Sequence, residues 1–307
     1  MRRILTIGLV AAALAAIFAI SIIPGIAQQL DIPDFESLEI AVLKAEEIAR
    51  YDAPEAVQGA AVDGNYFYAI VNLAIGKYEK ASGELVRRWI GSRGGPIQHI
   101  NSCYVEGTEL LCANSNYPQV PMASSIEIFD TEAMQHARTF SLGMMEEGSL
   151  TWFDRLGSGW VAGFAQYDGR GGLKYKDHSF STIVRYDSSW RREGGWMIAP
   201  SVIQRMKPMA ASGGSIGPDG LLYLSGHDRA EIYVLAAPAM GPTLIHIATI
   251  EIDAQGQAFA WDKSANDRIV YAISRSNRQV RSFRLPPVEL PEGVYRLNSA
   301  TVLEAKL

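Results

Sequence analysis

The sequence predicts an all-β protein built as a β-propeller. Five hairpins of one design recur at intervals of a few tens of residues, a short strand follows each hairpin, and another strand precedes the next hairpin. Repeats of four short antiparallel strands with a period of about 40 to 50 residues are typical of propeller blades. With 307 residues and 48% hydrophobic content, the chain is also large enough to build the core of such a ring.

The hairpin at 213–228 shows the pattern most clearly. Its turn, Gly217-Pro218-Asp219-Gly220, separates small and apolar residues from the alternating run Leu222-Tyr223-Leu224-Ser225. The other four hairpins lie at 58–72, 99–116, 148–168 and 256–275. These five hairpins are expected to be the two innermost strands of five blades.

The remaining strands complete each blade. Third strands are expected at 76–79, 125–129, 182–186, 231–235 and 279–283, and outer strands at 84–90, 137–142, 195–198 and 244–250. The fifth unit lacks an outer strand because Pro286-Pro287 cannot continue a central strand. We expect residues 46–51 to supply it, so that the first and last blades share one sheet. Five blades are favoured, and six is the alternative because the third unit carries an insertion at 169–181.

The N-terminus carries an export signal. Arg2 and Arg3 precede an apolar run at 4–23, and the small residues Gly25 and Ala27 follow it, so residues 1–27 are expected to be a signal peptide. An apolar run of this length could instead stay uncleaved as a membrane anchor. Both alternatives place the rest of the chain in the periplasm or outside the cell, in the second case anchored in the inner membrane. We expect a lead-in at 28–42, the propeller at 43–290, and a C-terminal strand or tail packing on it at 291–307.

Charge and cysteine content narrow the partners and the compartment. A net charge of -5 argues against a nucleic-acid-binding protein, which needs clustered Lys and Arg. Cys103 and Cys112 flank a turn, and they lie opposite each other if Val105 pairs with Leu110. A cross-strand disulfide is then expected, which an oxidising compartment would permit. Two buried thiols are the alternative.

The expected binding face lies where the innermost strands begin. In a propeller, these starts and the ends of the second strands meet on one face near the axis, which is the default binding site. Loop ends in any β protein are also polar, so turn chemistry is the competing explanation for each residue. The residues expected on this face are Gln58, His99, Asn101, Asn116, Glu147, Ser215, His227, Asp228, Gln257 and Arg275.

Histidine provides the candidates for catalysis. His99 and His227 fall on the expected binding face, where either could act as a general base or a metal ligand, and Asp228 follows His227 directly. His136 and His246 lie on outer strands and His178 lies in the insertion, so packing or surface roles are expected for these three. Calcium could be bound by side-chain oxygens converging on the same face, from Asn101, Asn116, Glu146, Glu147 and Asp228.

The hairpins GAAVDGNYFYAI, GGSIGPDGLLYLSG and AFAWDKSANDRIVYAI resemble the repeated phrases of lactonase-like, NHL-like and strictosidine-synthase-like propellers. The resemblance covers roughly 58–285 and rests on a shared turn pattern, x-D-x-x-G-x-hydrophobic-Y. It implies the architecture. Members of such families often hydrolyse lactones or isomerise small cyclic compounds with a divalent metal in the channel. Their Glu, Asn, Asn, Asp metal set is not found at matching blade positions here.

Two functions follow as hypotheses. The first is an exported, non-catalytic propeller that binds a small molecule, glycan or protein at the polar channel face. The second is a metal-assisted hydrolase or cycloisomerase of the lactonase type that uses His99 or His227. In either case, contact with a membrane is expected only through residues 4–23, and only if the signal is not cleaved.

Overall fold

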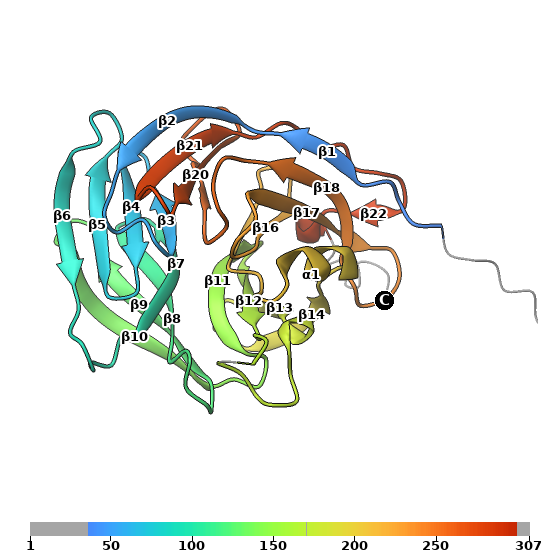
Figure 1. The fold of residues 1–307 in the computed structure, drawn as a ribbon, viewed down its shortest axis with the longest axis horizontal. Helices are drawn as coiled ribbons and strands as arrows, with labels where there is room; N and C mark the ends of the chain where they lie inside the picture. The colour runs from blue at the N-terminus through green and yellow to red at the C-terminus, as the bar shows by residue number, and fades with distance from the viewer. Residues whose placement is uncertain (1–35, 170, 300–307) are drawn as a thin grey trace, which may run out of the picture. The chain divides into compact units, whose positions relative to one another are not determined.

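The computed structural model describes residues 36–169 and 171–299 (Figure 1). The chain divides into two units, 1–37 and 38–307, and every helix and strand that is described belongs to the second. The expected signal peptide or anchor at 1–27 lies outside the described residues. Among the helices of the described part, none is long and apolar enough to cross a membrane.

The described strands form five four-stranded antiparallel blades, which confirms the predicted propeller with five blades rather than six. Blade 1 contains β3 (Gly59–Val62), β4 (Tyr66–Val71), β5 (Ala74–Glu79) and β6 (Leu85–Ile90). Blade 2 contains β7 (His99–Glu106), β8 (Glu109–Ser115), β9 (Ala123–Asp130) and β10 (Gln135–Met144). Blade 3 contains β11 (Ser149–Leu156), β12 (Gly159–Ala165), β13 (Thr182–Tyr186) and β14 (Arg192–Met197).

Blades 4 and 5 complete the ring. Blade 4 contains β15 (Gly213–Ile216), β16 (Leu222–Ser225), β17 (Glu231–Pro238) and β18 (Ile245–Glu251). Blade 5 contains β19 (Ala260–Trp261), β20 (Ile269–Ser274) and β21 (Gln279–Arg284), and its outer strand is β2 (Glu46–Asp52). The innermost strands β3, β7, β11, β15 and β19 pack against one another around the axis. The hydrophobic core is divided into clusters between neighbouring blades.

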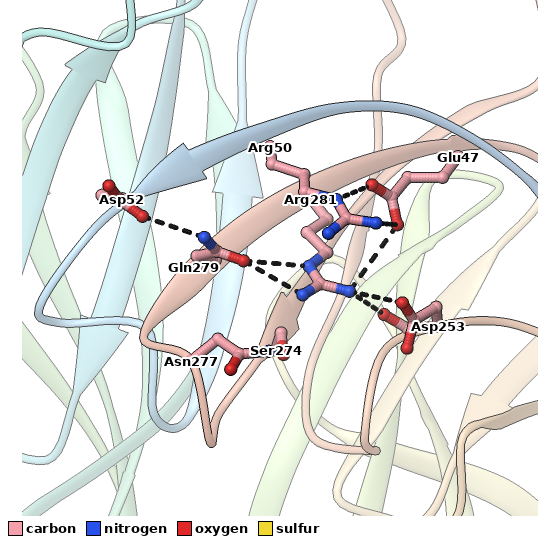
Figure 2. Close-up of polar contacts among 8 residues, drawn as sticks. All are labelled: Glu47, Arg50, Asp52, Asp253, Ser274, Asn277, Gln279 and Arg281. Atoms are coloured by element: carbon pink, nitrogen blue, oxygen red, sulfur yellow. Dashed lines mark hydrogen bonds and ion pairs between the residues drawn. The ribbon is translucent and has the colours of Figure 1, made fainter.

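The ring closes as the sequence predicts. β2 pairs antiparallel with β21 from the far end of the chain, with Glu46 opposite Arg284, and Figure 1 shows the two strands side by side. A polar cluster supports this joint (Figure 2). The buried Arg281 donates to the Asp253 carboxylate at 2.7 Å and to Gln279 Oε1 at 3.0 Å, and it lies 3.6 Å from Glu47. Its charge therefore ties β2, β21 and the loop between blades 4 and 5 together.

The repeated turn pattern has a physical explanation. Asp63 accepts hydrogen bonds from the backbone N–H of Asn65 and Tyr66, and its second oxygen accepts from the Tyr68 hydroxyl at 2.7 Å. In blade 4, Asp219 accepts from the Tyr223 hydroxyl at the same distance. A side-chain carboxylate that caps a turn and binds the following strand fixes the hairpin register. The Asp and Tyr of the repeated phrase are thus partners within one hairpin.

The disulfide prediction is confirmed. Cys103 is bonded to Cys112, and Val105 pairs with Leu110 in the register that places the two cysteines opposite each other. Both cysteines are buried between blades 1 and 2. The bridge therefore joins the two innermost strands of blade 2.

Four described elements, one strand, one helix and two 3₁₀ turns, were not predicted as such. β1 (Ala41–Lys44) begins within the expected lead-in and pairs in parallel with β18. The strand β22 (Val294–Tyr295) lies in the segment 291–307, where a C-terminal strand or tail was expected, and it pairs with the end of β17. The short helix α1 (Pro200–Met206) follows β14 and buries its apolar side between blades 3 and 4. The insertion contains one 3₁₀ turn, η1 (His178–Phe180), and a second such turn, η2 (Leu297–Ser299), follows β22.

Candidate functional site

A cavity of about 320 Å³ lies on the propeller axis, at the ends of the innermost strands. All five blades line it. This volume is at the lower end of the range of about 300 to 1,000 Å³ for small-molecule sites. The lining residues include Val62 and Asp63 of blade 1, Ser102 and Tyr104 of blade 2, Phe153 and Asp154 of blade 3, Ser215 of blade 4, and Phe259, Trp261 and Lys263 of blade 5.

A buried carboxylate forms one wall of this axial cavity. Asp154 is 1% exposed, and it accepts hydrogen bonds from the Ser215 hydroxyl, from the Ile216 N–H at 2.8 Å and from the Arg155 N–H at 2.7 Å. These bonds join β11 to β15 and compensate the carboxylate for the loss of water. Asp154 is therefore a fixed anionic group in a wall shared by blades 3 and 4.

A cation lies next to this carboxylate. Lys263 Nζ donates to the Tyr104 hydroxyl at 2.9 Å and lies 3.4 Å from Asp154. Burial alone would lower the pKa of Lys263, but the Asp154 carboxylate and the bond to Tyr104 raise it above the ordinary value. An ammonium group has three donors, so one remains for another acceptor. Because the side chain is 55% exposed, that donor is accessible from the cavity mouth.

Aromatic side chains form the apolar walls. Phe153, Phe259 and Trp261 line the cavity together with Val62. A charged donor beside aromatic surface can hold a molecule that has an anionic group on an apolar body. The site thus combines one accessible ammonium, the carboxylates of Asp63 and Asp154, several hydroxyls and apolar walls.

Ser215 is the predicted site residue that the structure places in this axial cavity, through its bond to Asp154. Gln58 and Asn72 are brought together, with Nε2 donating to Oδ1 at 2.7 Å. Asn116 binds its own loop, at the Ala123 N–H and the Pro121 carbonyl.

Further predicted residues support the backbone or pair at the surface. Asn101 donates to the Leu150 carbonyl at 3.1 Å, which links blade 2 to blade 3. Glu147 pairs with Arg192 at 3.3 Å. Gln257 is buried with a positive φ of 67°, and its carbonyl accepts from Ser225. The glycines that begin β15 are close-packing positions, since a Cβ on Gly214 would lie 2.4 Å from the Trp152 ring.

His227, Asp228 and Arg275 form one cluster. His227 Nδ1 lies 2.5 Å from Asp228 Oδ1, and its Nε2 lies 2.8 Å from Arg275. Because guanidinium only donates, Nε2 accepts from Arg275, and Nδ1–H donates to Asp228. Burial would raise the pKa of Asp228, but the bonds from His227 and Arg275 lower it overall. Both ring nitrogens are engaged, so this arrangement leaves neither for a substrate or a metal.

His99 lies apart from that cluster. Burial lowers its pKa to about 4, so the ring is neutral at physiological pH. The ring lies 5.2 Å from that of Tyr117, which in turn lies 4.8 Å from Tyr167. His99 therefore packs in an aromatic group with Tyr117 and Tyr167, from the loops of blades 2 and 3.

Among the described residues, one group of possible metal ligands occurs in blade 3, where Asp168 directly precedes the insertion and Asp177 and His178 lie within it. Asp168, Asp177 and His178 each place a ligand atom within 4.8 Å of the others. Asp168 accepts from the His178 backbone N–H at 3.0 Å, and this bond is the main cause of its lowered pKa. The His178 ring is buried and binds the same oxygen through Nδ1, at 2.7 Å. The sequence predicts a packing or surface role for His178, and it carries no signal that connects this residue with Asp168.

Comparisons with known proteins support the fold. No family model matches the chain, and no curated protein matches it. Among solved structures, the glutaminyl cyclase of Myxococcus xanthus is similar with a TM-score of 0.54 at 9% identity, over 82% of this chain and 100% of that one. The mitotic checkpoint complex gives a TM-score of 0.40 at 10% identity, over 85% and 98% of the two chains. The WD40 repeats of RRP9 give 0.39 at 9% identity, over 82% and 96%. The first likeness, at such low identity, supports the β-propeller fold alone.

Proposed function

We propose that this chain is an exported propeller that binds a small organic carboxylate in the axial cavity. The supporting observation is the accessible Lys263 ammonium, held at the cavity wall by Asp154 and Tyr104 and faced by aromatic side chains. The ligand carboxylate would accept the remaining Lys263 hydrogen, and its apolar body would pack between Phe153 and Phe259. The site lies at the end of the channel opposite to the one expected from the sequence.

Export is part of the same proposal. The disulfide between Cys103 and Cys112 fits an oxidising compartment, because cytosolic proteins rarely keep such bonds. The N-terminal export signal predicted at 1–27 agrees with this compartment.

The experiment measures the binding of benzoate to the purified propeller by titration calorimetry. Benzyl alcohol has a similar shape without the charge and serves as the ligand control. Lys263→Met keeps the apolar stem and is expected to weaken benzoate binding by about tenfold or more, the value of one charge-assisted hydrogen bond. Lys174→Met removes an exposed lysine of the blade 3 insertion and should leave binding unchanged. Equal binding of benzoate by Lys263→Met and the wild type would contradict the proposal.

A second candidate function is metal-assisted catalysis at the group formed by Asp168, Asp177 and His178. Both carboxylates have lowered pKa values, through hydrogen bonds from His178 to Asp168 and from Ser179 to Asp177, so both are ionised at neutral pH. Carboxylates and imidazole suit a divalent cation. The fold likeness to a glutaminyl cyclase is compatible with an enzyme on this scaffold.

Metal analysis of the purified chain tests this candidate. About one equivalent of bound cation is expected for the wild type, and Asp177→Asn should reduce it strongly. Asp187→Asn, which alters a turn carboxylate of the same blade, is the control. A cation content near zero for the wild type, or one unchanged in Asp177→Asn, would exclude the site.

A further inference from the structure

A second concave site lies between blades 1 and 2. It has a volume of about 500 Å³ and shares no lining residue with the axial cavity. One wall is the connection from Trp89 to Gln98, and the other is formed by β8, β9 and β10 of blade 2. We call this site the interblade groove.

A buried carboxylate forms the floor of the interblade groove. Glu127 is 3% exposed, and four groups donate to it. Ser125 Oγ and Asn114 Nδ2 lie 2.5 and 3.4 Å from one oxygen, and His136 Nε2 and Thr139 Oγ1 lie 2.8 and 2.6 Å from the other. Hydrogen bonds from all four groups compensate the buried carboxylate for the loss of water.

The bonds to Glu127 decide what the neighbouring groups can offer a ligand. Ser125 and Thr139 each donate their one hydroxyl hydrogen to the carboxylate, so only their lone pairs remain for a ligand. His136 donates through Nε2–H, which leaves Nδ1 as an acceptor. Asn114 Nδ2 donates its hydrogens to Ser125 Oγ and Glu127 Oε1. These four groups around Glu127 therefore offer a ligand acceptors and no spare donors.

The charge of the interblade groove also favours a ligand that donates hydrogen bonds. Glu127 is its one carboxylate, and no lysine or arginine is found among its described lining residues. A ligand with an anionic group would meet the carboxylate of Glu127 and no lysine or arginine among these lining residues. A neutral polyol would gain nothing from that charge, whereas a cation with several donors would use both the charge and the acceptors.

Apolar side chains define the rest of the ligand. Trp89, Ile90 and Ile97 line the opposite wall, and an indole face attracts a cation as well as packing on an alkyl chain. We propose that the interblade groove binds a small primary ammonium with a short apolar stem. The ammonium donates to the acceptors around Glu127, and the stem packs against the wall formed by blade 1.

The experiment measures binding of n-butylammonium to the whole chain by calorimetry, with 1-butanol and butyrate as ligand controls. The expected result is saturable binding of n-butylammonium and none of either control at equal concentration. Glu127→Gln keeps the shape, removes the charge and adds a donor, so affinity should fall at least about tenfold. Glu109→Gln, at an exposed carboxylate of β8 that pairs with Arg138, should bind as the wild type does.

A second pair of variants keeps the test decisive if Glu127→Gln does not fold. Ser92 is exposed on the connecting loop and lines the interblade groove. Ser92→Lys places a competing cation at the rim and should weaken n-butylammonium binding, while Ser92→Gln, of similar length, should not. The proposal is overturned if the wild type does not bind n-butylammonium, if 1-butanol binds equally well, or if Ser92→Lys and Glu127→Gln both retain full affinity.

Discussion

Replacing Asp154 by Asn is expected to destabilise the propeller and to weaken the axial site together. Asp154 is 1% exposed, and its oxygens accept from Ser215, from two backbone N–H groups and from Lys263. An amide has one acceptor oxygen and turns an NH₂ toward donors, so at least one buried donor loses its partner. Each such loss costs about 1 to 3 kcal/mol, and bonds to a charged acceptor lie at the upper end.

The expected loss for Asp154→Asn is therefore about 2 to 4 kcal/mol in the free energy of unfolding. In a domain of this size, 1 kcal/mol corresponds to about 2 to 4 °C, so the melting temperature should fall by roughly 4 to 16 °C. Calorimetric unfolding at pH 7 measures this shift. Glu106→Gln, which removes an exposed partner of Arg155, is the control and should shift the midpoint by less than about 2 °C. A midpoint for Asp154→Asn within that control range would refute the role assigned to the buried carboxylate.

Three further predictions concern the scaffold. Burial lowers the pKa of His246 to about 4 in the folded protein, against 6.5 in the unfolded chain. Between these two pH values the unfolded state binds more protons, so the free energy of unfolding falls as the pH decreases from 6.5 to 4. Between pH 7 and pH 5, the melting temperature of His246→Gln should fall by less than that of the wild type. An equal fall would show that this ring does not contribute to the pH dependence of stability. Removing the disulfide with Cys103→Ser and Cys112→Ser should lower the free energy of unfolding by about 2 to 3 kcal/mol, as expected for a loop of about ten residues, and urea unfolding with no change would contradict this. At the ring closure, Arg281→Met should lower the free energy of unfolding in urea by less than Arg281→Ala does. The methionine side chain keeps the packing of the buried arginine stem, and alanine does not. The reverse order would argue against a packing role.

The fold could be predicted because its signals are local. The turn pattern of Asp63 and Asp219 marks hairpins, and Pro286-Pro287 marks the blade that lacks an outer strand. The pairing of Cys103 with Cys112 followed from register alone. The helix α1 was missed because one short segment between two blades has no repeat to reveal it.

The candidate site was harder to predict for a physical reason. Both faces of an inner strand are buried in a propeller, so alternation does not tell which side chains face the axis. Asp154 ends an apolar run, and nothing in the sequence distinguishes it from a turn carboxylate. Lys263 lies in the segment Asp262-Lys263-Ser264, whose composition turn chemistry explains without any further role. Ser215 was selected for its position, but its partner Asp154 was not.

The most direct test of the central claim is a crystal structure of the wild-type chain soaked with benzoate. The account predicts ligand density in the axial cavity, with a carboxylate oxygen within hydrogen-bonding distance of Lys263 Nζ and the ring between Phe153 and Phe259. Benzoate bound instead at the opposite end of the channel, beside His99 or the cluster of His227 and Arg275, would contradict it.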